Sequence, residues 1–182
     1  MEKGFVIWIT GLPASGKTTV ARIVADKLRS MGLKVEMLDG DEVRKWLSPE
    51  AGFTREDRER HLRRVAYVSK LLARNGVAVI ASFVSPYRKI RSEIRQIIES
   101  ENIPFIEVYA KCSLQKCIER DPKGLYKKAL AGEIKHFTGL DDPYEEPENP
   151  EVTLDTENTS PKENAEKLLN YIKENILTQS NK

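Results

Sequence analysis

The sequence predicts a three-layer α/β fold, in which helices cover both faces of a five-stranded parallel sheet. Short β-branched runs alternate with amphipathic stretches along the chain, which is typical of βαβ units. The chain has 182 residues, of which 40% are hydrophobic and 32% charged, as expected for one globular domain over 1–182. The first apolar run leads directly into a glycine-rich loop and a helical pattern.

Local patterns locate each element. Strands are expected at about 5–10, 34–38, 77–82, 105–110 and 151–154. Helices are expected at about 17–31, 41–47, 55–75, 87–100, 113–120 and 161–177. Ser160 and Glu163 form a capping box around Pro161, Thr54 begins a similar box, and Gly32 and Gly76 end helices.

The stretch from Asp121 to Pro150 has a different composition. It is rich in Lys, Gly, Pro and acidic residues and has little apolar periodicity. Such a stretch inside a compact domain predicts a mobile lid, which we place at about 122–142. A disordered linker is the alternative, and it is disfavoured by apolar residues that can pack when the lid closes: Leu125, Tyr126, Leu130, Ile134 and Phe137.

Composition restricts the partners. With 30 basic and 28 acidic residues the formal charge is +2, so no general basic field indicates nucleic acid. No apolar run approaches the roughly 18 residues of a membrane span, so no membrane partner is expected. Cys112 and Cys117 are best interpreted as free thiols in a reducing compartment, and we therefore expect a cytoplasmic protein.

The most specific motif is the loop at 11–18, a full match to G-x-x-x-x-G-K-[ST]. In such a P-loop, backbone N–H groups and the positive end of the next helix bind phosphates. Lys17 is expected to reach the β- and γ-phosphates, and the Thr18 hydroxyl to ligate Mg²⁺. The predicted nucleotide-binding residues are Gly11, Leu12, Pro13, Ala14, Ser15, Gly16, Lys17, Thr18 and Thr19.

Two carboxylates, Asp39 and Asp41, follow the second predicted strand. The third strand ends in Ser82 and lacks the terminal aspartate of a Walker B sequence. Because the carboxyl ends of parallel strands face the ligand crevice, Asp39 or Asp41 is the candidate to hold Mg²⁺ with Thr18. One of the pair would also orient the acceptor hydroxyl or accept its proton. Capping of the short helix is the alternative role of Asp41.

Four further candidates lie near the predicted crevice. Arg44 and Arg58 carry fork-shaped guanidinium groups that suit a phosphate or sulfate. Phe53 is either a hydrophobic staple of the following helix or a platform for a flat ligand. Ser85, which precedes Pro86, fits a helix N-cap, and a contact to substrate is its second option.

Taken together, these segments resemble the adenylylsulfate kinases, which phosphorylate the 3′-hydroxyl of adenosine 5′-phosphosulfate with MgATP. The P-loop alone indicates only an NTPase, whereas SPYR at 85–88 and the run from KGLYKKA to FTG at 123–139 are specific to this family. The matching segments are 11–19, 39–44, 52–60, 82–88, 119–139 and 142–151.

The resemblance implies roles for individual residues. ATP and Mg²⁺ would be the cofactors, with Arg120 packed on the adenine of ATP. Arg44 and Arg58 would bind the phosphosulfate, and Lys123 would add charge from the lid. Phe53 and Phe137 would enclose the adenine of the acceptor, which favours the platform role of Phe53. Lys17, Asp39, Asp41 and Ser85 would form the catalytic set.

Ser85 matches a serine that the family's description gives as a phosphorylated intermediate, but direct in-line transfer is the preferred mechanism, with Ser85 acting by a hydrogen bond or backbone contact. His61 stands where the family usually has asparagine. It either replaces an amide donor with an imidazole donor or has lost that contact, and the neighbouring Arg60 should disfavour its charged form.

The resemblance further implies a homodimer and leaves association with an ATP sulfurylase open. Three rival functions remain. Another small-molecule kinase, for a nucleoside monophosphate or an alcohol, is the first, and Phe53 with Phe137 is the discriminating feature, since an aromatic sandwich needs a planar acceptor. A GTPase is disfavoured because the chain has no N-K-x-D motif. A non-catalytic nucleotide-binding regulatory module is disfavoured by the intact set of Lys17, Asp39, Asp41 and Arg58.

Overall fold

In the computed structural model, which describes residues 4–178, five parallel strands form one sheet in the order β2-β3-β1-β4-β5. The expected domain of 1–182 includes seven terminal residues, 1–3 and 179–182, that lie outside this range. The strands are β1 (Phe5–Thr10), β2 (Lys34–Asp39), β3 (Val77–Ser82), β4 (Phe105–Lys111) and β5 (Val152–Asp155). The predicted fold class is confirmed, and no predicted strand end is wrong by more than one residue.

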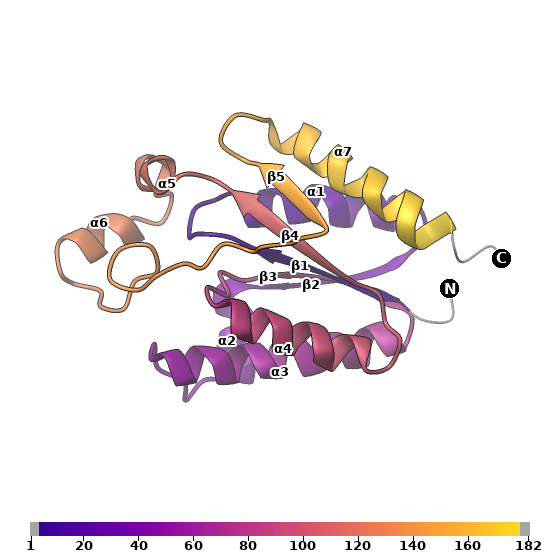
Figure 1. The fold of residues 1–182 in the computed structure, drawn as a ribbon, viewed down its shortest axis with the longest axis horizontal. Coiled ribbons are helices and arrows are strands. Elements are labelled where there is room, and N and C mark those ends of the chain that lie inside the picture. Colours follow the sequence, from indigo (N-terminus) through magenta and orange to yellow (C-terminus); the bar gives the residue numbers. More distant parts are fainter. Residues whose placement is uncertain (1–3, 179–182) are drawn as a thin grey trace.

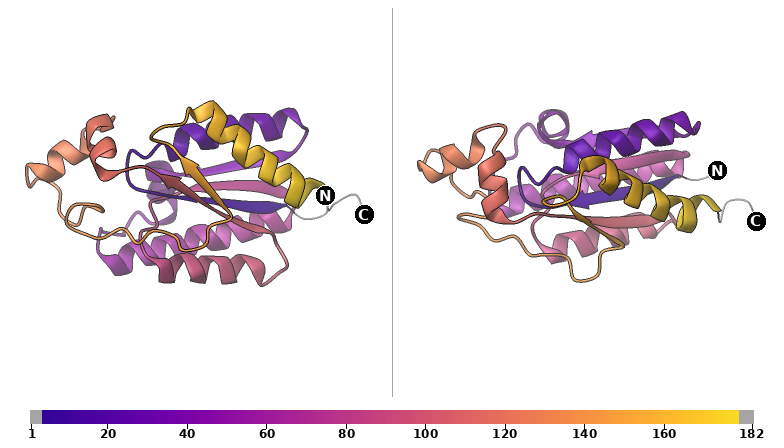
Figure 2. Two further views of the ribbon diagram at one scale, coloured as in Figure 1. Left: turned by 45° about the horizontal axis from the view of Figure 1, so that its top comes forward. Right: turned by 90° about the horizontal axis from the view of Figure 1, so that it is seen from above.

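Helices cover both faces of the sheet, as Figures 1 and 2 show. One face packs against α1 (Lys17–Ser30) and α7 (Pro161–Ile172), which continues into a π-helical turn at Lys173–Leu177. The other face packs against α3 (Arg55–Arg74) and α4 (Arg88–Glu99), with α2 (Gly40–Leu47) beside α3. Strands buried on both faces are nearly continuous apolar runs, and all six residues of β1 are buried, five of them apolar.

Side chains of the central strand alternate between two cores. Ile7 and Ile9 lie in the core that includes α1 and α7, whereas Val6 and Trp8 lie in the core that includes α3 and α4. This alternation decides which helix each residue at the end of a strand can meet. None of the helices within residues 4–178 is long and apolar enough to cross a membrane.

The predicted helix caps are confirmed in part. The capping box of α7 is complete, with Glu163 N donating to Ser160 Oγ at 3.2 Å and Ser160 N donating to the Glu163 carboxylate at 3.1 Å. At α3, Thr54 Oγ1 accepts a hydrogen bond from Asp57 N. The Asp57 carboxylate, however, accepts from Gly52 N at 3.0 Å, so this side chain stabilises the preceding turn instead of closing a box.

The predicted N-cap role of Ser85 is wrong. Helix α4 begins at Arg88, with Tyr87 in the cap position, and Ser85 has a φ of 41° in the left-handed region. Contacts from distant segments hold this conformation: Thr10 Oγ1 donates to Val84 O at 2.7 Å, and Glu145 N donates to Pro86 O at 2.8 Å. These tertiary hydrogen bonds keep residues 83–87 in a loop and delay the start of the helix.

Beyond the carboxyl ends of the strands lie α5 (Leu114–Arg120) and α6 (Leu125–Leu130), on the left of Figure 1. No helix was expected within 121–150, yet α6 forms there. The Asp121 carboxylate accepts hydrogen bonds from the N–H groups of Tyr126 and Lys127, both at 3.0 Å, which satisfies donors at the start of the helix. The fully buried Tyr126 then anchors α6 in a cluster with Cys112, Cys117 and Phe137.

Candidate active site

The P-loop connects β1 to α1, as the motif predicts (Figure 1). Gly11 has no room for a side chain, because a Cβ atom would lie 2.7 Å from both Ala110 O and Ser15 Oγ. Gly16, immediately before α1, has a φ of 87°, which favours glycine. These two residues let the backbone curl tightly at the positive end of a 14-residue helix. The result is a ready anion site.

The Lys17 ammonium group is held by its own loop. Its Nζ donates to Gly11 O at 2.9 Å and to Leu12 O at 2.8 Å. Burial lowers the pKa of Lys17 to about 8, and the charge of Asp39 opposes this shift. The lysine that would meet the terminal phosphates is therefore already inside the loop, bonded to two neutral carbonyl groups.

The P-loop helix is tied directly to the acidic end of β2. Thr18 Oγ1 donates to Asp39 Oδ2 at 2.5 Å. Asp41 lies in the first turn of α2, 81% of its side chain is exposed, and Lys123 Nζ lies 3.6 Å from its Oδ2. Asp39 occupies the cap position of α2, so Asp41 is not the helix cap. Both carboxylates thus remain available for ligands.

The residues present suit Mg²⁺. Thr18 and Asp39 offer oxygen ligands, and the hydroxyls of Ser15 and Ser82 are buried without a hydrogen-bond partner among residues 4–178. Over the same range, no three His, Cys, Asp or Glu side chains form a closed metal cage. Mg²⁺ in kinases is held by one or two protein oxygens plus phosphates and waters, which is the type of site these residues can provide.

Arg44 and Phe53 lie together. The Arg44 guanidinium group donates to Ala51 O at 3.3 Å and to Gly52 O, and it lies 4.9 Å from the centroid of the Phe53 ring. Burial and the nearby charge of Arg58 lower the pKa of Arg44. Two cations that act on each other in this way favour an anion near them. Phe53 is 64% exposed, as a platform for a flat ligand requires.

Arg58 links α3 to the segment 121–142. Its guanidinium group donates to Thr138 Oγ1 at 2.9 Å and to His136 O, and it lies 3.6 Å from Asp142 Oδ2. The sequence indicated an anion-binding role for this residue and gave no sign of these contacts. Arg58 is therefore the residue that joins the predicted acceptor site to the predicted lid.

Phe137 lies in surroundings different from those of Phe53. It is 8% exposed and packs edge to face on Tyr126, with the ring centroids 4.9 Å apart. Tyr126 also donates its hydroxyl to Pro13 O in the P-loop at 2.8 Å. The Tyr126 side chain thus connects Phe137 to the P-loop. The enclosure of the acceptor's adenine by Phe53 and Phe137 remains a prediction.

His61 is buried and neutral. Ser48 Oγ lies 2.9 Å from His61 Nδ1 and accepts a hydrogen bond from Arg64 at 3.1 Å. Because arginine can only donate, this arrangement favours a Ser48 hydroxyl that donates to Nδ1 and an imidazole that carries its proton on Nε2. Burial, together with Arg44 and Arg64, lowers the pKa of His61 to about 4. The expected direction is confirmed, but Arg60 is not one of the cations responsible.

The Ser85 hydroxyl is enclosed by protein. Ser85 is 2% exposed, accepts a hydrogen bond from Trp8 Nε1 at 3.1 Å and donates to Phe83 O at 3.0 Å. Trp8 packs in the core on the α3 and α4 side, so this hydroxyl belongs to the layer opposite α1 and its Thr18. The arrangement suits a structural hydrogen bond better than a nucleophile.

Sequence reasoning missed Arg91. This residue of α4 is 2% exposed, and its guanidinium group donates to Ser85 O at 2.6 Å and to Glu145 O at 2.5 Å. Glu107 of β4 supplies the carboxylate for the buried charge at 3.6 Å. The helical period was the available signal, because Arg91 is adjacent to the buried stripe of Ile90, Ile94 and Ile98.

Arg120 lies at the end of α5, near the P-loop. It donates to Thr156 O at 2.6 Å and approaches Cys112 Sγ at 3.6 Å. Thr156 is the residue nearest to a Cβ atom built on Gly16, at 3.8 Å. Arg120 therefore lies beside the P-loop, and its contact with the adenine of ATP remains a prediction. Cys112 and Cys117 are buried free thiols, as expected.

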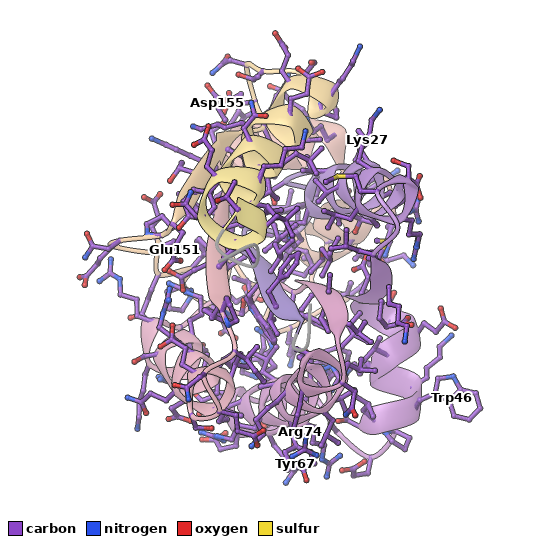
Figure 3. All side chains as sticks on the ribbon, turned by 90° about the vertical axis from the view of Figure 1, so that its right-hand side faces the viewer. Lys27, Trp46, Tyr67, Arg74, Glu151 and Asp155 are labelled. Atoms are coloured by element: carbon purple, nitrogen blue, oxygen red, sulfur yellow. The ribbon has the colours of Figure 1, made fainter. Side chains whose placement is uncertain are left out.

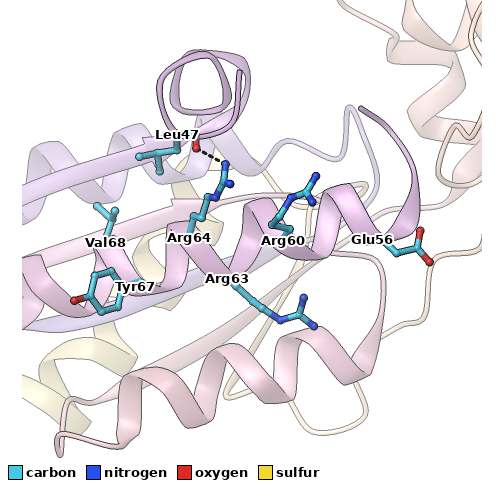
Figure 4. Close-up of a pocket in the computed structure, with 7 residues that line it drawn as sticks. All are labelled: Leu47, Glu56, Arg60, Arg63, Arg64, Tyr67 and Val68. Carbon is cyan, nitrogen blue, oxygen red and sulfur yellow. Dashed lines mark hydrogen bonds between the residues drawn. The ribbon is translucent and has the colours of Figure 1, made fainter. Parts of the chain in front are cut away.

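Two hollows border these elements. One lies between Leu12 of the P-loop and residues Gly139–Tyr144. The other is the groove between α2 and α3 in Figure 4, lined by Leu47, Glu56, Arg60, Arg63, Arg64, Tyr67 and Val68. The arginines of this groove are paired with carboxylates, Arg60 with Asp57, Arg63 with Glu93, and Arg64 with Glu50. No predicted site residue lines it, so the P-loop crevice is the stronger candidate.

The parallel sheet, the complete P-loop and the Thr18–Asp39 pair define an ATP-dependent P-loop kinase. The family model described as "Adenylylsulphate kinase" matches residues 3–155. This chain belongs to the adenylylsulfate kinase family, as its motifs indicated.

Individual relatives agree. The "Probable adenylyl-sulfate kinase" of Aeropyrum pernix is 57% identical over 173 residues, covering 95% of this chain and 94% of the relative. The adenylyl-sulfate kinase of Myxococcus xanthus is 54% identical over 151 residues, covering 83% and 81%. The structure of the Mycobacterium tuberculosis APS kinase in complex with AMPPNP and APS aligns with a TM-score of 0.92 at 41% identity, covering 95% of this chain and 99% of that one.

Proposed function

We propose that this kinase transfers the γ-phosphoryl group of MgATP to the 3′-hydroxyl of adenosine 5′-phosphosulfate, giving 3′-phosphoadenosine 5′-phosphosulfate and ADP. The observation that carries the proposal is the Thr18–Asp39 hydrogen bond of 2.5 Å, which joins the P-loop helix to the acidic end of β2. The titles and names of the similar proteins support the choice of adenylylsulfate as acceptor.

On the donor side, the backbone of 11–18 and Lys17 bind the phosphates, and Arg120 lies on the adenine. Thr18 and Asp39 would hold Mg²⁺, which would neutralise charge that develops on the phosphate oxygens. Lys17 must exchange the carbonyl groups of Gly11 and Leu12 for phosphate oxygens when ATP binds. Its positive charge then stabilises the transferring group.

On the acceptor side, Arg44 and Arg58 bind the phosphosulfate, and the exposed ring of Phe53 supports the adenine with Phe137 on its other face. Asp41 orients the 3′-hydroxyl and accepts its proton as the oxygen attacks the γ-phosphorus. The bond from that phosphorus to the bridging oxygen of ADP breaks in line. Lys123, which lies 3.6 Å from Asp41, adds positive charge at the same place. His61 presents an Nε2–H donor in place of an amide.

We further propose that residues 1–182 form one domain and that 122–142 act as its lid. Arg58 supports the lid role through its contacts with His136, Thr138 and Asp142. We also propose that the protein is a homodimer and that it is cytoplasmic. Trp46 is 82% exposed and Tyr67 54%, and Figure 3 shows Trp46 pointing away from the body of the protein, as a residue of an apolar contact surface would.

Association with an ATP sulfurylase is a second form of assembly. A bifunctional SAT/APS kinase of Sorangium cellulosum is 50% identical over 171 residues, which make up 29% of that protein. An APS kinase from Thiobacillus denitrificans is described as hexameric. The Sorangium relative supports a combined arrangement, and the solution mass of the purified kinase, alone and mixed with an ATP sulfurylase, tests the two forms of assembly.

The test of the proposed function is ADP release from MgATP with a panel of acceptors. We expect turnover with adenylylsulfate and none with AMP or gluconate, because neither carries the sulfate that Arg44 and Arg58 would bind. A gluconokinase from Sinorhizobium meliloti shares the fold at a TM-score of 0.63 and 20% identity, which makes gluconate a fair control. Turnover with AMP or gluconate, but not with adenylylsulfate, would disprove the proposed acceptor.

A second prediction concerns Ser85→Ala. Removing this hydroxyl leaves Trp8 Nε1 without its acceptor, which we expect to cost about 1–3 kcal/mol of stability. Because the hydroxyl faces protein groups, kcat should fall by less than about tenfold, a barrier change of about 1.4 kcal/mol. Thermal unfolding and initial rates measure the two effects. Complete loss of activity, with phosphoserine trapped in the parent enzyme, would contradict the in-line mechanism.

A further inference from the structure

A buried hydroxyl without a partner stands at the end of β3. Ser82 is 2% exposed, and its Oγ has no hydrogen-bond partner among the described residues. Leaving a polar group buried and unpaired costs free energy, and such groups are few in native proteins. Ser69 shows the usual solution, because this fully buried serine donates its hydroxyl to Val65 O at 2.8 Å.

The position of Ser82 is well defined. In the parallel register it lies beside Asp39 of β2 and Ile9 of β1. Side chains alternate along a strand, so Ser82 faces the same side as Ile80, whose core contains α1. By the same alternation Asp39 shares the side of Met37, and it meets Thr18 of α1 there. Ser82 therefore has its side chain on the face of the P-loop helix, at the strand end where a Walker B aspartate would stand.

We propose that Ser82 is a positioning residue for the magnesium ion of MgATP, and that its hydroxyl binds a water molecule of the ion's hydration shell. Mg²⁺ keeps several of its waters in such sites, and these waters need acceptors or donors on the protein. The Ser82 hydroxyl, which has no partner among the described residues, can form a hydrogen bond with such a water. The proposal rests on the proposed function for MgATP as the donor, and not on the identity of the acceptor.

The proposal predicts that stability and metal binding respond in opposite directions to Ser82→Ala. The affinity of the enzyme–ADP complex for Mn²⁺, measured by the EPR signal of free Mn²⁺, should fall about tenfold or more. The affinity for ADP without divalent metal, measured by calorimetry, should change by less than about twofold. The melting temperature should stay the same or rise, because an unpaired buried hydroxyl has been removed.

Ser69→Ala is the matched control. It removes an equally buried hydroxyl that does have a partner, inside α3 and away from the end of β3, so Mn²⁺ affinity should stay unchanged. A hydroxyl with only a structural role at 82 would behave like this control.

Three results for Ser82→Ala would overturn the proposal. These are unchanged Mn²⁺ affinity, a fall in melting temperature, and loss of ADP binding in the absence of divalent metal. The last would assign the hydroxyl to a phosphate or to Lys17. If the alanine variant does not fold, Ser82→Cys keeps the size, removes the oxygen and gives the same readouts. None of these measurements uses an acceptor, so failure of the acceptor panel and failure of this proposal are distinguishable.

Discussion

Replacing Lys17 with alanine is expected to lower kcat by about 10²–10³-fold, the effect of losing about 2.7–4 kcal/mol of transition-state stabilisation. The reason lies in the loop geometry. Lys17 is the cation inside the P-loop. When ATP is bound, no other side chain of the loop can supply this positive charge. The measurement is ADP release at saturating MgATP and adenylylsulfate.

A loss of stability should not account for this fall in kcat. Lys17 is buried with a lowered pKa, so the folded protein gains little from its charge, and the melting temperature should stay close to that of the parent. Lys27→Ala serves as the control, since Lys27 is exposed in the last turn of the same helix and should leave kcat unchanged. A Lys17→Ala enzyme that keeps the parent kcat would show that the P-loop assignment is wrong.

The P-loop and the sheet could be predicted from the sequence because both follow from local constraints. Phosphate binding needs fixed residues at fixed spacing, as at Gly11, Gly16 and Lys17. A buried parallel strand needs a short apolar run with clear ends, and each of the five runs shows its ends to within one residue. Parallel topology then brings Asp39 to the loop, which made its pairing with Thr18 predictable.

Contacts between segments far apart in the chain could not be predicted in the same way. Arg91 holds Ser85 and Glu145, 54 positions away, and Tyr126 reaches Pro13 over 113 positions. No local pattern encodes such pairs, and for this reason the N-cap prediction for Ser85 was wrong and helix α6 was not foreseen. The partner of His61 was missed for a similar reason, because Ser48 lies on the other side of the Phe53 turn.

The second large effect is expected for Arg58→Ala, which removes contacts on both sides of the proposed acceptor site. The variant loses its hydrogen bonds to Thr138 and His136 and its ion pair with Asp142, and with them a cation for the phosphosulfate. Hydrogen bonds to charged groups are worth about 1.5–3 kcal/mol, so kcat/KM for adenylylsulfate should fall about 10²-fold.

The division of that loss between the substrates tests what Arg58 does. The KM for ATP should change little, because the P-loop and Thr18 remain intact, whereas the KM for adenylylsulfate should rise. Arg60→Ala is the control on the same helix, since Arg60 pairs with Asp57 and contacts no predicted site residue. Equal losses for both substrates would mean that Arg58 only supports the fold. A loss confined to adenylylsulfate assigns Arg58 to the acceptor site, on the side where it contacts residues 136–142.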